Sequence, residues 1–461
     1  MTDSDHRNVT HAGTTSTKLD VRVSPGAYFV AAGLATFAAA LLLRTDRNGW
    51  ALIVLAFVFI ALPVFAVNDR VAFVGDSIQR VGPIAFILKL LFQYRKRLAI
   101  SDFETVATHA VRTLRRGGKV RYRYRTQITG KGHDFAIVSG GKNYRRLIRE
   151  LLPLVHEEKL DTRSRDLRDY LNEPQLVNRK TQLFQLAPSD ILDLTKADFK
   201  LPPGRVSDNQ TPCANDAERA HLLRRLGNEL RVLGRLREAG EAFRRALNVT
   251  PRAPWTIYDF ARLLRSQASA QHDARLLFRA RAALRLACLR ANDDLVLLRL
   301  IGESFLECGD ARQAQKVLQK ALEIDRGSFK ARLGLADVAL REGKLAHVIH
   351  HYQEAAQTTS EQALARFARR EADYYLRLNT DEEYLASELR RINWLESVTR
   401  VRRLSARVTT AGMLLALIGG FLDASAASVG WSVASSALLA WMLTLIISRL
   451  LLTRSKPRSL A

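Results

Sequence analysis

The densest group of chemically useful side chains in this sequence is a run of seven cations within 14 residues, with no acid among them: Arg112, Arg115, Arg116, Lys119, Arg121, Arg123 and Arg125. An anionic phospholipid leaflet attracts each nearby cation by about 1 kcal/mol, and nucleic-acid phosphates would use the same residues. Because no base-reading motif accompanies the run, we favour anionic phospholipid as its partner over RNA or DNA. A basic face that only contacts solvent is the alternative.

Signatures of catalysis do not stand beside these cations. The sequence has no phosphate-binding loop, no dinucleotide fingerprint, no GxSxG and no HExxH motif. His347, His350 and His351 could place two imidazoles on one helix face, but we assign them no accompanying carboxylate or cysteine and expect surface histidines. The three cysteines share no metal-ligand spacing. We therefore predict no catalytic residue, no metal site, no cofactor and no enzymatic activity.

Charge and composition place the basic run in a wider context. The 461 residues carry 71 Lys and Arg against 46 Asp and Glu, a net charge of +25, and nearly half of this excess lies between residues 69 and 155. A hydrophobic fraction of 47% and only 12 prolines exclude a chain that is disordered throughout.

Long uncharged segments predict a membrane protein. Residues 26–43 and 50–67 each form an 18-residue stretch without a charge, and residues 408–448 contain Asp423 as their only charge. An 18-residue helix spans roughly 27 Å, close to the ~30 Å hydrocarbon core of a bilayer. We predict four transmembrane helices in two hairpins, the second made of residues 408–422 and 429–448 with a loop at 423–430.

Basic residues near the ends of these segments predict the orientation. They concentrate after the second helix, before the third and after the fourth, at Arg70, Arg400, Arg402, Arg403, Arg407, Arg449, Arg454, Lys456 and Arg458. Since loops rich in Lys and Arg stay in the cytoplasm, both termini and residues 69–407 should face it. We expect a multi-pass protein of a bacterial inner membrane.

Residues 69–155 read as strands followed by one helix. Residues 120–125 alternate between Arg and an apolar or aromatic residue, as in a strand with two different faces, and a glycine-rich turn follows at 129–133. An amphipathic helix is expected over 144–155. This order, clearest from Leu98 to Val155, resembles a bacterial PH-like domain and implies a small α+β fold. The apolar segment 83–92 departs from the resemblance and suggests an interfacial helix.

Residues 220–362 contain an internal repeat. Gly309 and Gly343 lie 34 residues apart, as do Ala321 and Ala355, and an earlier copy with Gly234 follows the same register. The pattern resembles tetratricopeptide repeats (TPR), in which small residues let paired helices approach closely. The resemblance implies a second copy with about seven extra residues near 267–273.

The same resemblance implies that the first helix of each pair lines a concave groove. The residues at groove positions are mostly basic: Arg224, Asn228, Arg231, Arg262, Arg299 and Lys330. Arg224 and Asn228 match the start of a carboxylate clamp, whereas Asp259, Val296 and Leu300 depart from it. We expect a groove that binds an acidic segment of a protein partner.

Together these features predict a multi-domain membrane protein with four transmembrane helices, a small α+β PH-like domain and an all-α TPR solenoid. The expected parts are a polar tail (1–25), a transmembrane hairpin (26–67), the PH-like basic domain (69–155), a linker (156–215) with a short helix at 190–194, the solenoid (216–380), a stalk helix (381–407), the second hairpin (408–448) and a basic tail (449–461). We expect a non-enzymatic scaffold, in envelope or polysaccharide assembly for example. A membrane-tethered nucleic-acid-binding protein is the alternative.

Overall fold

The computed structural model describes residues 19–23, 26–92, 97–114, 120–139, 142–186 and 214–452. These residues fall into two compact units. The first contains 19–23, 70–81 and the described part of 85–373, and the second contains 26–69, 82–84 and 374–452. Each unit is considered by itself.

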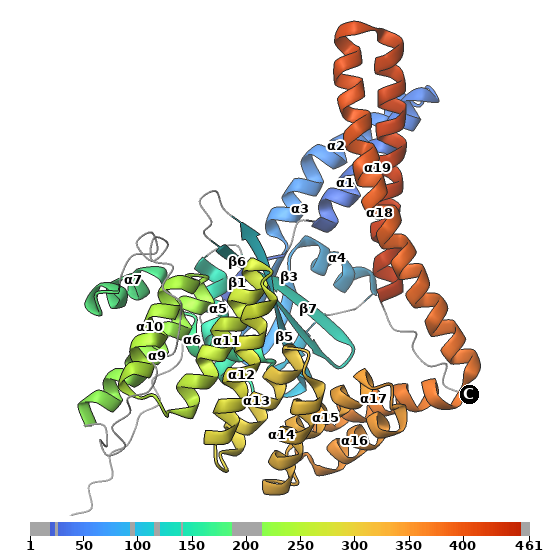
Figure 1. Cartoon of the computed structure of the whole chain (residues 1–461). Coiled ribbons are helices and arrows are strands. Elements are labelled where there is room, and N and C mark those ends of the chain that lie inside the picture. The colour runs from blue at the N-terminus through green and yellow to red at the C-terminus, as the bar shows by residue number, and fades with distance from the viewer. Residues whose placement is uncertain are drawn as a thin grey trace, which may run out of the picture. The chain divides into compact units, whose positions relative to one another are not determined.

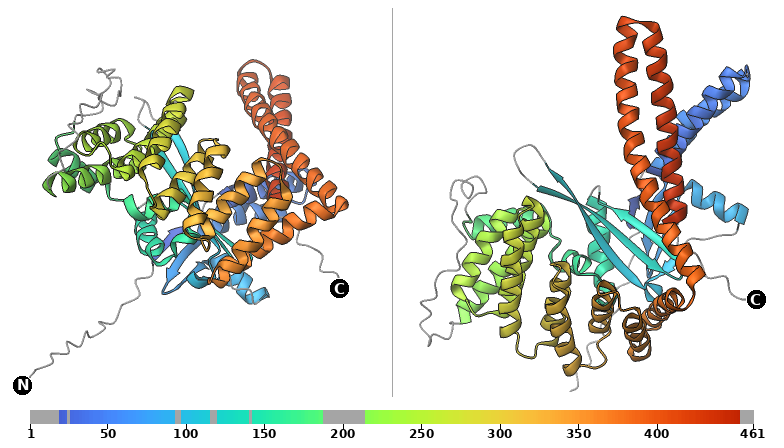
Figure 2. Two further views of the ribbon diagram at one scale, coloured as in Figure 1. Left: turned by 60° about the horizontal axis from the view of Figure 1, so that its bottom comes forward. Right: turned by 45° about the vertical axis from the view of Figure 1, so that its right-hand side comes forward.

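The first unit contains two antiparallel sheets (Figures 1 and 2). The four-stranded sheet has the order β1 (Leu19–Arg22), β2 (Arg70–Val74), β3 (Ser77–Val81) and β4 (Arg97–Ala99), and the three-stranded sheet has the order β5 (Thr105–Leu114), β6 (Val120–Gly130) and β7 (His133–Val138). Helix α4 (Pro83–Phe92) connects β3 to β4, and helix α5 (Lys142–Leu151) follows β7.

Strand β1 corrects the expectation that residues 1–25 form only a polar tail. It pairs with β2 from Leu19 opposite Phe73 to Arg22 opposite Arg70, and Val21 is buried. The chain thus begins the sheet, passes through the apolar helices of the second unit, and returns to the sheet at β2. The tail was misread because four residues are too few for a recognisable alternation.

The core of the β region lies between the sheets and α5. Ile128 on β6 and Leu147, Ile148 and Leu151 on α5 have no exposed surface. Their spacing on α5 is that of one apolar helix face, and the opposite face carries Arg145 and Arg149, so burial of the apolar face holds the helix in place.

The segment expected to be a linker is folded over its first half. It forms a 3₁₀ turn (Glu157–Lys159), helix α6 (Thr162–Tyr170) and helix α7 (Pro174–Leu183). Asp161 caps α6 by accepting a hydrogen bond from the Ser164 amide at 2.7 Å. The short helix expected at 190–194 lies outside the described residues.

Helical pairs make up the rest of the first unit. They are α9 (Ala214–Leu233) with α10 (Leu236–Val249), α11 (Pro254–Gln271) with α12 (Ala274–Arg290), α13 (Leu295–Glu307) with α14 (Ala311–Ile324), and α15 (Phe329–Arg341) with α16 (Leu345–Thr358). Figure 1 shows them as a TPR-like helical array that continues into α17 (Gln362–Thr380).

The turns within these pairs account for the glycine register. Gly234, Gly309 and Gly343 connect the two helices of their pairs with φ of 84°, 74° and 74°, a region that favours glycine. In the α11–α12 pair, His272 takes this left-handed position with φ 54°. The extra residues of the second copy lengthen α11 to 18 residues and α12 to 17, against 13 or 14 in the two pairs that follow.

The second unit is built from apolar helices. Helix α1 (Gly26–Arg44) is followed by a helical stretch made of α2 (Asn48–Ala56), a π-helical turn (Phe57–Ala61) and α3 (Leu62–Asn68), and the long helices α18 (Glu382–Leu422) and α19 (Ala424–Leu452) lie side by side in Figures 1 and 2. The expected stalk and third apolar segment are one helix, α18. The expected loop at 423–430 is reduced to Asp423, and its remaining residues belong to α19.

Length and composition mark three of these stretches as candidates for crossing a membrane: Asn48–Asn68, Glu382–Phe421 and Ala424–Ser448. Within α1, the apolar helix Tyr28–Ala39 is shorter.

Candidate functional site

The basic groove residues lie on the first helices of the pairs, as their spacing predicts. Arg224, Asn228 and Arg231 belong to α9, Arg262 to α11, and Arg299 to α13. They do not line an open groove, however. Except for Arg224, which pairs with Asp259 at 3.5 Å, they contact each other and the segment from Glu157 to Asp166 of the same chain.

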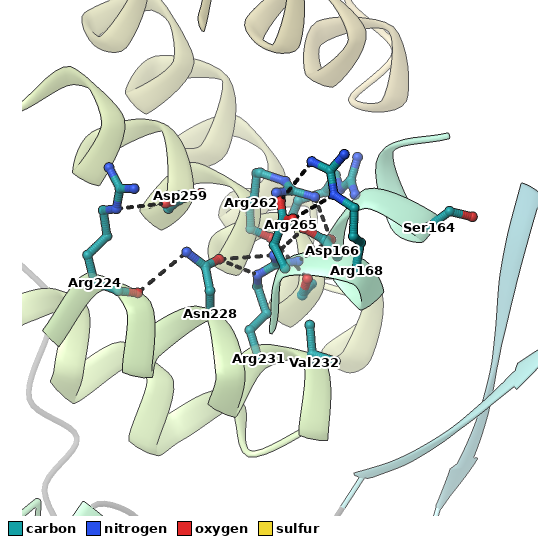
Figure 3. Close-up of polar contacts among 12 residues, drawn as sticks. Ser164, Asp166, Arg168, Arg224, Asn228, Arg231, Val232, Asp259, Arg262 and Arg265 are labelled. Atoms are coloured by element: carbon teal, nitrogen blue, oxygen red, sulfur yellow. Dashed lines mark hydrogen bonds and ion pairs between the residues drawn. The ribbon is translucent and has the colours of Figure 1, made fainter. Parts of the chain in front are cut away.

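Asp166 on α6 is the centre of this contact (Figure 3). Arg231 donates two hydrogen bonds to its carboxylate, at 2.9 and 3.1 Å, and Arg262 donates a third at 2.5 Å. Asn228 accepts from the same Arg231 guanidinium at 3.0 and 3.2 Å. All four side chains are buried, with Asp166 only 7% exposed. This arrangement is a desolvated bidentate ion pair with a second arginine added.

The charges of this cluster stabilise one another. Burial alone would raise the pKa of Asp166, but Arg231 and Arg262 outweigh it and hold the pKa at about 2. Burial alone would lower the pKa of Arg262, and Asp166 reverses that effect, so its pKa is raised. Both partners are therefore charged at neutral pH.

A second contact lies further along the array. Arg299 donates to Glu157 at 3.2 Å, and Lys330 on α15 donates to the Leu160 carbonyl at 3.0 Å. Thr162 donates to Glu303 on α13 at 3.1 Å. The 3₁₀ turn and α6 thus follow the basic residues across α9, α11, α13 and α15.

The other side of this segment is attached to strand β5. The Thr108 amide donates to the Asp161 carboxylate at 3.1 Å, and the Asp161 amide donates to the Val106 carbonyl at 3.1 Å. The Ser164 hydroxyl lies 2.8 Å from the Thr108 hydroxyl and donates to Val106 at 3.1 Å. We name residues 157–171 the wedge, because they connect the β region to the concave side of the helical pairs.

The wedge corrects the expected peptide-binding groove. An acidic segment does occupy the basic concave face, but it belongs to this chain. The prolines of 156–215 suggested a flexible linker, and the charged residues of α6 gave no clear periodicity. The spacing of Leu160, Leu167 and Leu171, all buried, was the signal that could have identified a packed segment.

Only part of the predicted lipid-binding run can be located. Arg123 and Arg125 lie on β6 and are exposed, opposite Val111 and His109 of β5. The backbones of Arg112 and Arg121 are paired in the same ladder, one residue out of register with each other. Arg115, Arg116 and Lys119 lie outside the described residues.

Tyr122 and Tyr124 alternate with these arginines and are partly buried. The hydroxyl of Tyr124 donates to the Val232 carbonyl on α9, and the two tyrosine rings lie 6.2 Å apart. The aromatic side of β6 therefore packs towards the helical pairs.

The histidines of α16 need one correction. Glu354 lies one turn after His350, and ligand atoms of His350, His351 and Glu354 lie within 4.8 Å of one another. However, Glu354 already forms an ion pair with Arg332, whose positive charge would repel a metal ion. Burial, His350 and Arg332 lower the pKa of His351 to about 4. The absence of a metal site remains a prediction.

Comparisons with known proteins add little to this geometry. No protein-family model matches the chain, and no curated protein matches it. Among solved structures, the crystal structure of the APC/C hetero-tetramer Cut9–Hcn1 is similar at 14% identity and a TM-score of 0.30, covering 67% of this chain and 52% of that chain.

Proposed function

We propose that this chain is a non-enzymatic, membrane-anchored scaffold whose helical pairs recruit an acidic segment of another protein. The observation that carries the proposal is the outer face of helix α12. Since the wedge fills the concave side of the array, the partner has to bind elsewhere, and α12 presents the unpaired cations that the concave side lacks.

Helix α12 contains five arginines and no acidic residue. Arg275 and Arg279 are exposed and form no ion pair with any residue that the structure describes. Phe278 and Leu289 are 66% and 80% exposed on the same helix. Exposed aromatic and arginine side chains together are typical of the centre of protein interfaces.

Charge complementarity selects the partner. An acidic helix or extended segment with an apolar residue to cover Phe278 would neutralise Arg275 and Arg279. A membrane surface is a poorer match, because two separated apolar side chains do not form the wide apolar face of an interfacial helix.

The β region and the apolar helices support anchoring at a membrane. A four-stranded meander, a three-stranded meander and a C-terminal helix form the strand order of a PH-like domain. Gly82 connects β3 to α4 with φ 151°, and Phe86 and Leu90 of α4 are both exposed. We propose that α4 lies in the membrane interface and that the apolar helices span the bilayer.

The recruiting face is tested by charge reversal. The double variant Arg275→Glu/Arg279→Glu is expected to lose a partner that co-purifies with the full-length protein from detergent extracts. Its matched control is Arg312→Glu/Lys316→Glu, which reverses two exposed cations at the same spacing on α14. A synthetic acidic peptide from the captured protein should compete for the wild type. Equal capture by both double variants would contradict the proposal.

Orientation is tested by labelling single cysteines in a variant without native cysteines. Asn48→Cys, in the turn between α1 and α2, should react with a membrane-impermeant maleimide in intact spheroplasts. Glu323→Cys, exposed on α14, should react only after lysis. Reaction of Glu323→Cys from outside would place the helical pairs in the wrong compartment for the proposed scaffold.

A further inference from the structure

The first unit contains a cavity that the scaffold function does not use. It has a volume of about 670 Å³ and lies between strands β5 and β6 and helices α6, α9, α11, α12 and α13. A volume in this range is typical of sites for small ligands. Its walls combine arginines with tyrosines, so the charge of the walls decides what it could bind.

The acidic groups of the cavity are already paired. Asp166 is bound by Arg231 and Arg262, and Glu307 forms an ion pair with Arg265. Asp273 caps α12 by accepting from the Arg275 amide at 2.8 Å. None of these carboxylates is left to repel an incoming anion at full strength.

One guanidinium is left over. Arg163 lines the cavity from α6 and forms no hydrogen bond or ion pair with any described residue. The field of these groups is positive enough to affect Arg265: burial and the charges of Arg262 and Arg231 lower its pKa to about 10. Arg265 still carries its charge at neutral pH and lies in the same wall.

The opposite wall suits a planar ring. Tyr122 and Tyr124 line it from β6, and the hydrogen bond from Tyr124 to Val232 holds one ring in place. Leu277 and Ala110 add apolar surface beside them. Aromatic rings of this kind stack on nucleobases without selecting a particular base.

We propose that this cavity binds a nucleotide-class ligand, with its phosphate at Arg163 and Arg265 and its planar ring against Tyr122 and Tyr124. The proposal is independent of the recruiting face on α12. It assigns a small-molecule site to the junction where the wedge, the β region and the helical pairs meet.

Equilibrium dialysis of the full-length protein in detergent tests this site with three probes: guanosine 5′-monophosphate, guanosine and inorganic phosphate. The monophosphate is expected to bind at least about tenfold more tightly than either fragment, because only it uses both walls. Tyr122→Leu should weaken the monophosphate and leave phosphate unchanged.

Two variants of α6 make the test specific. Arg163→Gln should weaken the monophosphate about tenfold or more, since it removes the unpaired cation. Arg168→Gln is the matched control, because this arginine pairs with Asp169 at 2.7 Å and does not line the cavity. Equal affinity in the two variants, equal binding of all three probes, or no binding of the monophosphate would each overturn the proposal.

Discussion

Asp166→Ala is expected to destabilise the first unit by about 3–5 kcal/mol, because it leaves Arg231 and Arg262 buried without their shared carboxylate. The loss should appear as a lower midpoint of thermal unfolding. It should also appear as faster hydrogen exchange in α6, α9 and α11, the three helices that the cluster joins. Other helices of the array, such as α16, should be affected less.

A control on the same helix separates this effect from a general change in α6. Asp169→Ala removes an exposed carboxylate that pairs only with Arg168 among the described residues, so it should cost less than about 1 kcal/mol. Replacing the whole cluster, as Asp166→Leu/Arg231→Met/Arg262→Met, should recover much of the stability, since no buried charge then lacks a partner. If Asp166→Ala is no worse than Asp169→Ala, the wedge does not hold the unit together.

The same cluster predicts a dependence on pH. The pKa of Asp166 in the folded protein is about 2, below the value of 3.8 for an unperturbed aspartate. A lowered carboxylate pKa stabilises the folded state above the unfolded value, and the effect is lost as pH falls towards 2. The contribution is roughly 2 kcal/mol above pH 4. Asp166→Ala should remove this part of the acid dependence, whereas Asp169→Ala should keep it.

The helical pairs could be predicted from sequence because their packing is local and repeated. Gly302 shows why: a Cβ at this position would lie 2.6 Å from Leu318 on the paired helix, so only glycine fits where α13 and α14 approach. A requirement that recurs every 34 residues leaves a periodic trace in one sequence. The alternation of Arg and Tyr along β6 is a local pattern of the same kind.

The wedge could not be predicted in this way. Asp166 is one of two aspartates in α6, and nothing near it in sequence distinguishes it from Asp169. Its partners lie 65 and 96 residues away, on two different helices. The basic concave face was identified correctly as a surface that binds carboxylates, but the identity of its occupant depends on the path of the chain.

The turn between α18 and α19 was misread for a related reason. Small residues between 423 and 430 suggested a loop, whereas they continue the helix and let it approach its neighbour. Asp423 makes the turn and accepts a hydrogen bond from the Ser425 amide at 3.1 Å. Gly430 lies against the backbone of Ala416, where a Cβ would come within 2.4 Å of the amide nitrogen. Small residues at such positions are typical of closely packed membrane helices.

Two adjacent glycines of α18 give this close approach a sharp test. A Cβ at Gly419 would lie 2.5 Å from the backbone nitrogen of Ala427 on α19, whereas a Cβ at Gly420 would meet nothing within 4 Å. Gly419→Val should therefore force the helices apart and cost about 1–3 kcal/mol or more. Gly420→Val changes the helix propensity by the same amount at a site with free space, so it should be close to neutral. The measurement is the midpoint of thermal loss of helical circular dichroism for the full-length protein in detergent. Equal midpoints for the two variants would show that α18 and α19 are not packed backbone against backbone at this end of the hairpin.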